Sequence, residues 1–476
     1  MKILISTIFR EEKLRAYYDH FYRWLIKNIN RENVDVKILL PERLYAGFHE
    51  NNEMKAAMTP VLITSKDLEK IFGEDLSEIV YHQKFYITGL NDGELERFKI
   101  LTRTVLGSWY PDIVLKLGYF SSRKIWNDIF PNALCLTQEN GIFSRPPFFR
   151  TLTYDPYSAL QNNFMNTFAD DIKNLKITPN QDKSVNKFKK QLTRIIDSNS
   201  NINKELKYYK KRFKKLVLLP LTSDYMIKIF KEDFIYNSEL ELIKSVMENM
   251  PTDIGVFVTQ HSDLGTLTQQ DIEYFSSKYK NFIYLQKTDG KGFFFNSLFY
   301  FKHVDAVINL TSKTGLMAML WDKPILSLAK ISNELIKDGQ GVEDLEKVLN
   351  TPYKNKNNII YWYFTRYLLL EPDFNRQDYM YEYLMKKLKY YKEHGIDFGY
   401  FDEVNNFEEA SETIVNHLKI YYQPAYIKAF LEVIKEIKTK ITEIQTKIKN
   451  KIQNKVQNKV QLIIKKTKML YIIINN

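Results

Sequence analysis

The stretch VDAVINLTSKTGLMAMLWDKPILSLA, residues 304–329, decides the fold. Its first part, from Val304 to Leu310, is mostly apolar and short, which predicts a buried strand that ends at the polar turn after it. Ser312 is a natural N-cap for a helix over 314–321, and a Lys-Pro pair then leads into a second strand. This order of strand, helix and strand is typical of a parallel α/β unit.

The turn after the first of these strands predicts a phosphate site. It consists of Thr311, Ser312, Lys313, Thr314 and Gly315. The first turn of the helix carries hydroxyls and no carboxylate, so its free N–H groups and positive dipole end are available to an anion. An ordinary helix cap would use the same residues, and the turn alone leaves both interpretations open.

Length and composition indicate a soluble protein of two domains with an appendage. The chain has 476 residues, more than the roughly 250–300 at which a single core stops growing. Hydrophobic residues make up 44% and charged residues 26%, which leaves ample core. The single cysteine, Cys135, excludes a disulfide within one chain and favours a reducing compartment. The sequence shows neither a signal peptide nor an apolar run of about 18 residues, so we expect a cytoplasmic protein.

The net charge of +12 is concentrated in one segment. Residues 425–476 hold twelve lysines and three glutamates, a net charge of +9, which leaves +3 on the rest of the chain. A nearly neutral body with a basic tail does not favour nucleic-acid binding.

Strands and helices alternate in two halves, which predicts two Rossmann-like domains that face a cleft. In the first half we expect strands at 2–7, 34–40, 61–64, 112–118 and 133–141, with helices at 12–30 and 94–106. In the second half we expect strands from 216, 254 and 282, with helices near 238–250 and 294–302. The expected divisions are an N-terminal domain at 1–150, a connection with insertions at 151–214, a C-terminal domain at 215–424 and a helical tail at 425–476.

Three strand ends carry residues suited to chemistry. Glu139, Asn140 and Gly141 end one strand, and a carboxylate there could serve as a general base, although Asn-Gly also marks ordinary turns. Asp224 ends the strand from 216 and could instead be a helix N-cap. His261 follows the strand from 254, where an imidazole could contact a phosphate or could be structural.

Together these sites resemble the motifs of bacterial two-domain glycosyltransferases of the GT-B type that use CMP-activated sugars. The resemblance is closest to the retaining β-Kdo (3-deoxy-manno-octulosonate) transferases of capsule and lipopolysaccharide assembly, and the sialyltransferases are related. It covers about residues 110–330. It implies that Glu139 is a catalytic carboxylate and that His261, Thr311 and Ser312 contact the CMP phosphate, with Lys313, Thr314 and Gly315 completing the phosphate turn.

The same resemblance suggests roles for the remaining motif residues. Asp224 matches a further acid that opens the second domain, and Arg145 matches an arginine-bearing loop after the acidic motif. We therefore expect Asn140, Gly141 and Arg145 to contact substrate, and the basic segment 210–215 is another candidate for the sugar carboxylate. This chain departs from the family pattern at Asn140, which replaces a second acid, and at Ser262, which replaces a proline.

The expected reaction transfers a sugar, with Kdo as first choice, from a CMP-sugar to a glycan or glycolipid acceptor. A CMP-sugar has a single phosphoryl group, so no metal and no further cofactor is expected. Retention of configuration requires a carboxylate nucleophile, for which we expect Asp224, with Glu139 as acid/base. Two alternatives are a CMP-sialate sialyltransferase and a CDP-polyol phosphate transferase of the teichoic-acid type. A carbohydrate-binding protein without nucleotide chemistry also stays open.

The basic tail has its own pattern. Apolar residues at 430, 434, 437, 441, 444 and 448 alternate in steps of four and three, and later repeats step by four. A repeat of four overshoots the helical turn, so the apolar stripe winds around the helix, which argues against a long coiled coil. The flanking lysines favour a helix that lies on an anionic membrane. We expect the protein to be peripheral on the inner face of the cytoplasmic membrane through residues 425–476.

Overall fold

The structure is a computed structural model of the chain. It describes residues 1–6, 29, 32–41, 58–73, 90–117, 123–157, 163–199, 203–229, 233–260, 265–285, 296–330, 333–424 and 432. The chain forms two compact units, one of residues 1–288 and 293–418, the other of residues 289–292 and 419–476. Both sheets lie in the first unit.

The described part of the first half forms six strands of a seven-stranded sheet, whose order is β13-β6-β5-β4-β1-β2-β3. Five strands run parallel: β1 (Lys2–Ser6), β2 (Asp35–Pro41), β3 (Thr59–Ile63), β4 (Ile113–Leu117) and β5 (Leu134–Asn140). Two further strands extend the sheet: β6 (Thr151–Asp155) pairs antiparallel with β5, and β13 (Leu369–Leu370) pairs antiparallel with β6. The central strands are apolar and fully buried because helices cover their faces, as in other doubly wound sheets.

The second sheet is parallel throughout its described strands, in the order β12-β11-β10-β7-β8-β9. Its strands are β7 (Lys215–Pro220), β8 (Ile254–Thr259), β9 (Phe282–Tyr284), β10 (Ala306–Asn309), β11 (Ile325–Ser327) and β12 (Gly339–Gln340). The chain adds β8 and β9 on one side of β7, and β10, β11 and β12 on the other. Such a reversal of strand order is where ligands bind in doubly wound sheets, beyond the carboxyl ends of the strands.

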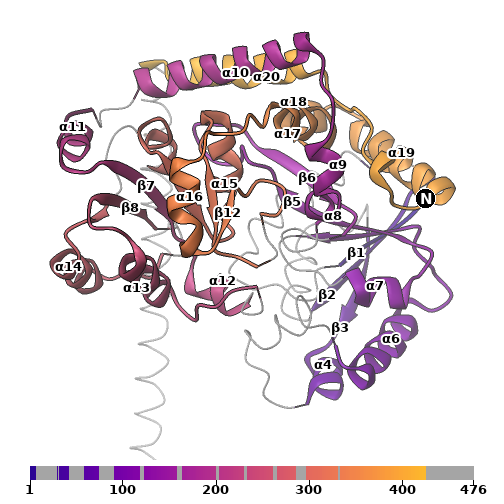
Figure 1. Cartoon of the computed structure of the whole chain (residues 1–476). Coiled ribbons are helices and arrows are strands. Elements are labelled where there is room, and N and C mark those ends of the chain that lie inside the picture. Colours follow the sequence, from indigo (N-terminus) through magenta and orange to yellow (C-terminus); the bar gives the residue numbers. More distant parts are fainter. Residues whose placement is uncertain are drawn as a thin grey trace, which may run out of the picture. The chain divides into compact units, whose positions relative to one another are not determined.

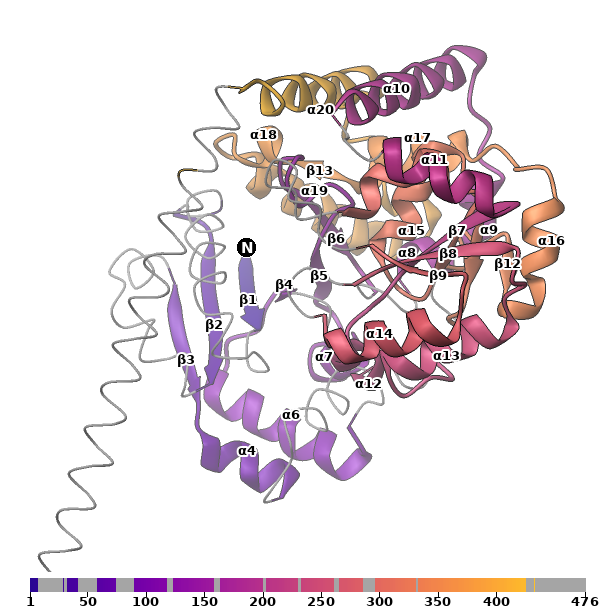
Figure 2. The same ribbon diagram turned by 90° about the vertical axis from the view of Figure 1, so that its left-hand side faces the viewer.

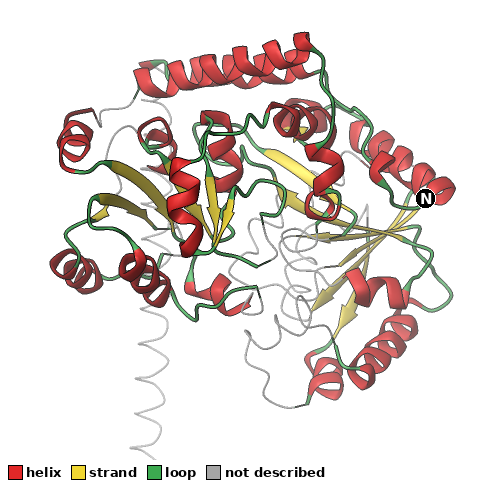
Figure 3. Cartoon of the chain, in the orientation of Figure 1, coloured by secondary structure: helices red, strands yellow, loops and turns green. Residues whose placement is uncertain are grey.

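Helices flank both sheets (Figures 1 and 3). Those of the first half are α4 (Ser65–Phe72), α6 (Asp92–Leu106) and α7 (Arg123–Ile129). Those after β6 are α8 (Phe164–Thr167), α9 (Ala169–Lys173), α10 (Pro179–Ser198) and α11 (Asn203–Arg212). The second half adds α12 (Asp224–Ile229), α13 (Glu239–Asn249), α14 (Gln269–Lys278), α15 (Lys313–Ala318) and α16 (Leu345–Asn350). The last are α17 (Asn357–Trp362), α18 (Glu371–Phe374), α19 (Tyr379–His394) and α20 (Phe407–Tyr421).

Short helical turns complete the described elements. The 3-10 turns are η3 (Asn296–Phe299), η4 (Phe301–His303), η5 (Met319–Trp321), η6 (Val342–Asp344) and η8 (Phe398–Tyr400), and η7 (Tyr363–Tyr367) is a π-helical turn that continues α17. Helices α10 and α20 lie side by side in both views (Figures 1 and 2), and the rings of Phe188 and Phe407 are in contact between them.

The expected α/β class with two parallel sheets is confirmed. The strands expected in the two halves all form, and the helices expected near 94–106 and 238–250 are α6 and α13. The stretch expected to be helical near 294–302 forms the 3-10 turns η3 and η4 instead, and the helix expected over 314–321 begins at Lys313 and tightens into η5. The helix expected at 12–30 and the tail at 425–476 lie outside the described residues, apart from Ile29 and Glu432.

The segment after β12 returns to the first sheet. Strand β13 pairs with β6, and β6 itself begins the stretch that we expected to be an interdomain connection. The first sheet therefore combines strands from residues 2–155 with a strand from residues 369–370. This return brings η7, the π-helical turn just before β13, close to the carboxyl end of β5.

Candidate active site

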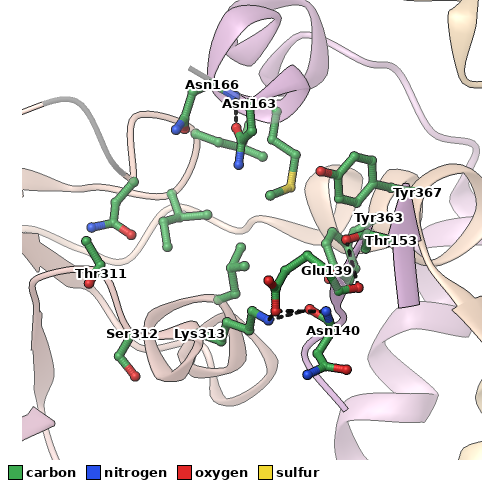
Figure 4. A pocket seen from close by; sticks show the side chains of 15 residues that line it. Glu139, Asn140, Thr153, Asn163, Asn166, Thr311, Ser312, Lys313, Tyr363 and Tyr367 are labelled. Atoms are coloured by element: carbon green, nitrogen blue, oxygen red, sulfur yellow. Dashed lines mark hydrogen bonds and ion pairs between the residues drawn. The ribbon is translucent and has the colours of Figure 1, made fainter. Parts of the chain in front are cut away.

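A pocket lies where the carboxyl end of β5 meets the amino end of α15 (Figure 4). Its lining combines residues of the first sheet, of the turn after β10, and of the elements that follow β6 and β12. The lining residues are Glu139, Asn140, Thr153, Asn163, Met165, Asn166, Thr311, Ser312, Lys313, Leu316, Asn333, Leu335, Ile336, Tyr363 and Tyr367. The pocket volume is about 60 Å³, well below the roughly 300–1,000 Å³ of a typical ligand site.

A lysine and a glutamate reach across this pocket toward each other. The ammonium Nζ of Lys313 lies 2.6 Å from Oε1 of Glu139 and also donates to the backbone carbonyl of Asn140. The side chain of Glu139 is only 4% exposed and that of Lys313 is 25% exposed. The same carboxylate oxygen accepts the backbone N–H of Asn140 at 2.8 Å. Figure 4 shows that this pair spans the space between the two halves of the lining.

The turn before α15 forms as the sequence predicts. Ser312 is the N-cap: its Oγ accepts the N–H of Thr314 at 3.2 Å and donates to the Thr314 hydroxyl at 2.7 Å. Thr311, Ser312 and Lys313 line the pocket, whereas Thr314 and Gly315 are buried beside it. The capping interpretation of Ser312 is therefore correct, and its hydroxyl is still part of the pocket wall.

Gly315 allows α15 to pack closely on β10. A Cβ at this position would lie 2.5 Å from Nδ2 of Asn309. Asn309 is fully buried, and its Nδ2 donates to Oδ1 of Asn333, whose own Nδ2 donates to the carbonyl of Leu310. This asparagine pair fixes the base of the pocket, so the role of Gly315 in this structure is packing.

The other residues expected near Glu139 are divided between the pocket and its support. Asn140 lines the pocket. Gly141 is buried, and a Cβ there would clash with Thr151 and Leu368, so this glycine permits the close approach of β6 and of the residue that joins η7 to β13. Arg145 is half-buried in the loop after β5 and is not part of the pocket lining.

Asp224 lies outside the pocket that contains Glu139, and its contacts are with helix α13. It is the first residue of α12, and its Oδ1 accepts the backbone N–H of Glu239 at 2.6 Å. Glu239, the first residue of α13, is fully buried, and its Oε2 accepts the hydroxyl of Thr266 at 2.5 Å. Burial, which outweighs the hydrogen bonds from Thr266, raises the pKa of Glu239 to about 7, and the Asp224 charge adds to this rise. Asp224 does not line the pocket.

His261 lies outside the described residues. Its neighbour Gln260 is described: Nε2 donates to the hydroxyl of Tyr284, and Oε1 is buried without a hydrogen-bond partner in the described structure. Burial raises the pKa of Tyr284, and the Gln260 hydrogen bond opposes this rise.

The basic segment 210–215 makes contacts away from the pocket. Lys214 pairs with Asp253 at 2.6 Å, and Lys215 donates to the carbonyl of Leu349. Arg212 donates to the carbonyl of Lys280. None of the residues of this segment lines the pocket.

The sequence pattern does not indicate the pocket residues that come from η7 and α8. Tyr363 and Tyr367 belong to η7 and line the pocket beside Glu139. Burial raises the pKa of Tyr363, and the negative charge of Glu139 adds to this rise. Asn163, the N-cap of α8, lines the opposite wall. The only signal in the sequence is the aromatic density of 361–367, and it does not predict the place where these rings lie.

Within the described residues, no three His, Cys, Asp or Glu side chains are grouped so that they could hold a metal ion. The helices of the described ranges include none with the length and apolarity needed to cross a bilayer.

The fold and the pocket are those of a two-sheet α/β protein that brings a buried carboxylate to a hydroxyl-capped helix carrying a lysine. Residues 163–336 match the model of a family described as "Capsule polysaccharide biosynthesis protein". The match covers the pocket-lining segments from α8 to Ile336, just before β12, including the turn Thr311–Lys313. It supports the resemblance to sugar transferases of capsule assembly. A search of curated proteins finds no match.

Solved structures that this chain resembles include two that are titled as KpsC transferases and an epimerase. The β-Kdo 2,7 transferase of Thermosulfurimonas dismutans KpsC is 12% identical, with 81% of this chain and 98% of that chain covered and a TM-score of 0.41. The structure titled as the β-Kdo 2,4 transferase of Thermosulfurimonas dismutans KpsC is 14% identical, with 56% of this chain and 84% of that chain covered and a TM-score of 0.36. The UDP-GlcNAc 2-epimerase of Methanocaldococcus jannaschii is 13% identical, with 75% and 96% covered and a TM-score of 0.30. Identities and TM-scores this low do not transfer an activity.

Proposed function

We propose that this protein is a glycosyltransferase that transfers a sugar, with Kdo as first choice, from a CMP-activated donor to a glycan acceptor of capsule or lipopolysaccharide assembly. The proposal depends on one observation: Glu139, in β5 of the first sheet, and Lys313, at the start of α15 after the second sheet's β10, meet at 2.6 Å in one pocket. A carboxylate suits proton transfer with the acceptor, and an ammonium beside a helix cap suits a phosphate leaving group. The family match over 163–336 supports the capsule assignment.

Donor binding requires the pocket to change, because the pair of Lys313 and Glu139 occupies its centre and leaves little volume. We assign the donor phosphate to Thr311, Ser312 and Lys313. A phosphate at Ser312 competes with Glu139 for the ammonium, since charge-assisted bonds to phosphate are strong. The ammonium then moves from the carboxylate to the phosphate, and this movement frees Glu139 for chemistry.

In the proposed chemical step, Glu139 handles the proton and Lys313 stabilises the leaving group. In an inverting reaction, Glu139 accepts the proton of the acceptor hydroxyl, the hydroxyl oxygen bonds to the anomeric carbon, and the bond from this carbon to the phosphate oxygen breaks. The electron pair leaves with the CMP phosphate, where Lys313 stabilises the developing charge. His261, outside the described residues, is a further proposed contact of this phosphate.

Retention would require a carboxylate nucleophile, for which Asp224 is the proposed group. In this structure the carboxylate of Asp224 accepts a hydrogen bond from the amino end of α13, and Asp224 lies outside the pocket lining. The variant Asp224→Ala separates the two mechanisms: near-normal transfer excludes the covalent route and leaves the inverting one, whereas loss of transfer with unchanged CMP binding supports a covalent intermediate.

The donor class is tested by thermal unfolding and by turnover. CMP should raise the melting temperature of the full chain because a ligand that binds only the folded state stabilises it. Transfer or hydrolysis of CMP-Kdo, CMP-sialate and CDP-glycerol then identifies the donor. Activity with CMP-sialate or CDP-glycerol alone would replace Kdo by the corresponding alternative. If CMP does not stabilise the protein and none of the three donors is turned over, the proposal is wrong.

The membrane contact through residues 425–476 is also a proposal, supported by the +9 charge of this segment. Vesicles with anionic lipid should bind the full chain and should bind a chain that ends at residue 424 much less. Equal binding of both chains to anionic vesicles, with neutral vesicles as control, would exclude this role of the tail.

A further inference from the structure

A second concave surface lies at the other end of the helical segment that begins in the active-site pocket. We call it the basic groove, and its volume is about 540 Å³. Lys313 lines the pocket at the start of α15, and Trp321 lines the groove at the end of η5. Lys313 and Trp321 are eight residues apart along this helical segment, a rise of about 12 Å. The groove is therefore close to the active site but separate from it.

The groove is strongly cationic. Five lysines and arginines and two aspartates line it, a net charge of +3. Both aspartates are already neutralised, because Asp322 pairs with Lys189 and Asp197 pairs with Lys302. The positive charge that remains is available to a ligand.

Two of the remaining cations lie on the exposed face of α10. Lys190 and Arg194 are exposed, one helical turn apart, and neither side chain has an ion pair or hydrogen bond within the described structure. Residues at this spacing have Cβ atoms about 5–6 Å apart, so both can contact one extended ligand. Lys323 provides a third cation from the opposite wall, and burial together with the nearby Lys210 lowers its pKa.

The groove also contains a buried donor that lacks an acceptor. Trp321 is 7% exposed, and its ring packs on Phe301 with 5.0 Å between centroids. Its indole N–H has no hydrogen-bond partner within the described ranges. A buried N–H of this kind usually finds an acceptor, so its presence at the groove points to a ligand oxygen.

We propose that the basic groove binds a segment of acidic polysaccharide, with sugar carboxylates at Lys190 and Arg194 and a sugar oxygen at the indole N–H of Trp321. The choice of glycan rests on the proposed function, because a chain built from a carboxylated sugar is a polyanion. A concave surface with a recessed indole also suits a chain of sugars better than the flat surface of a bilayer. The groove would hold a part of the acceptor or product remote from the reacting end.

The probe for the test is a carboxylated oligosaccharide, the hexamer of galacturonic acid, with its methyl ester as the neutral match. Binding to the full chain is measured by calorimetry. The hexamer should bind, and its ester should bind at least tenfold more weakly. The double variant Lys190→Glu/Arg194→Glu should lose at least tenfold in affinity. The matched control is Lys183→Glu/Lys187→Glu, which makes the same charge change at exposed positions of the same helix outside the groove lining.

The variant Trp321→Phe isolates the indole N–H, since it keeps an aromatic ring. It should lose about threefold to tenfold in affinity for the hexamer, with an unchanged response to salt. Equal losses in the control and groove variants, or equal binding of the ester, would overturn the proposal. Phosphatidylglycerol vesicles and inorganic phosphate serve as competitors, and a groove that binds only these is not a glycan site. The measurement is repeated with Glu139→Gln, where hexamer binding should persist without transfer, so failure of the proposed function is distinguishable.

Discussion

Two glutamates are almost completely buried near the carboxyl edges of the two sheets, and their surroundings differ. Glu139 is 4% exposed and shares an ion pair with Lys313, whereas Glu239 is fully buried beside the carboxylate of Asp224 and has one oxygen without a partner in the described structure. Burial with no cation raises the pKa of Glu239 to about 7. Two carboxylates that are buried to a similar extent thus differ in their partners: Glu139 has a cation within 2.6 Å, whereas hydrogen bonds from Thr266 only partly offset the burial of Glu239.

The largest effect should follow from removing the carboxylate that pairs with Lys313 in the pocket. Glu139→Gln preserves the shape of the side chain but cannot accept a proton, so transfer should fall roughly 10²–10⁴-fold. The measurement is turnover of the donor with acceptor present, and retained stabilisation by CMP serves as the control for an intact donor site. Near-normal turnover in this variant would show that another group accepts the proton.

Removing the cation should make Glu139 resemble Glu239. In Lys313→Met the carboxylate stays buried and loses its partner, so transfer should fall roughly 10²-fold through weaker stabilisation of the leaving phosphate. Stability should also fall, by less than the roughly 3–5 kcal/mol of a fully buried pair, because a quarter of the Lys313 side chain is exposed.

The partner variants of this pair make the comparison quantitative. Lys313→Arg keeps the positive charge and should recover part of both losses. The double variant Lys313→Met/Glu139→Gln should be more stable than Lys313→Met alone, because no unpaired charge remains. Additive losses of stability in the double variant would show that the two side chains are not energetically coupled, and the cation would then not explain the difference between Glu139 and Glu239. Chemical unfolding of the unaltered chain, Lys313→Met, Glu139→Gln and the double variant measures the coupling energy.

Glu239 should make the protein less stable as the pH rises. Its pKa is about 7 in the folded chain against an ordinary value of 4.5 for glutamate, so between these pH values the folded state binds more protons than the unfolded state. Stability therefore decreases from about pH 4.5 to about pH 7 and then levels off, by about 3 kcal/mol in total at 1.36 kcal/mol per pKa unit.

The variant Glu239→Gln should remove this part of the pH dependence. Its matched control is Glu241→Gln, an exposed position in the first turn of the same helix, where the hydrogen bonds from Asn237 lower the pKa. Unfolding in denaturant at several pH values measures both. An unchanged slope between pH 5 and pH 7 in Glu239→Gln would mean that Glu239 is ionised throughout.

The sequence predicts those parts of the site that lie at strand ends. Glu139 and the turn with Ser312 follow apolar runs that polar residues end abruptly, and both occur where the pattern indicates. Periodicity does not reveal that Lys313 reaches a carboxylate 174 positions earlier in the chain, because this contact depends on how the two sheets meet. The two-residue strand β13 is likewise too short for any pattern, yet it brings Tyr363 to the pocket.

The contrast between Glu239 and Glu241 shows the same limit within one helix turn. Both are acids in the first turn after the N-cap Ser238, where negative charge is favourable, and the sequence treats them alike. One is fully buried and the other exposed because α13 packs with the Glu239 side toward Asp224 and Thr266. Propensity and capping predict the helix, whereas tertiary packing decides which carboxylate is perturbed.

The smallest effect concerns the hydrogen bonds that partly replace a cation at Glu239. The hydroxyl of Thr266 donates to Oε2 at 2.5 Å and lowers the pKa, against the larger effect of burial. Thr266→Val removes this donor and should raise the pKa of Glu239 by about one unit, since hydrogen bonds to charged groups are worth roughly 1.5–3 kcal/mol. The midpoint of the pH-dependent stability should move upward accordingly. Thr266→Ser keeps the hydroxyl and should leave the midpoint in place. A midpoint that Thr266→Val does not move would mean that burial alone sets the proton affinity of Glu239, and hydrogen bonds would then have no part in the difference between the two glutamates.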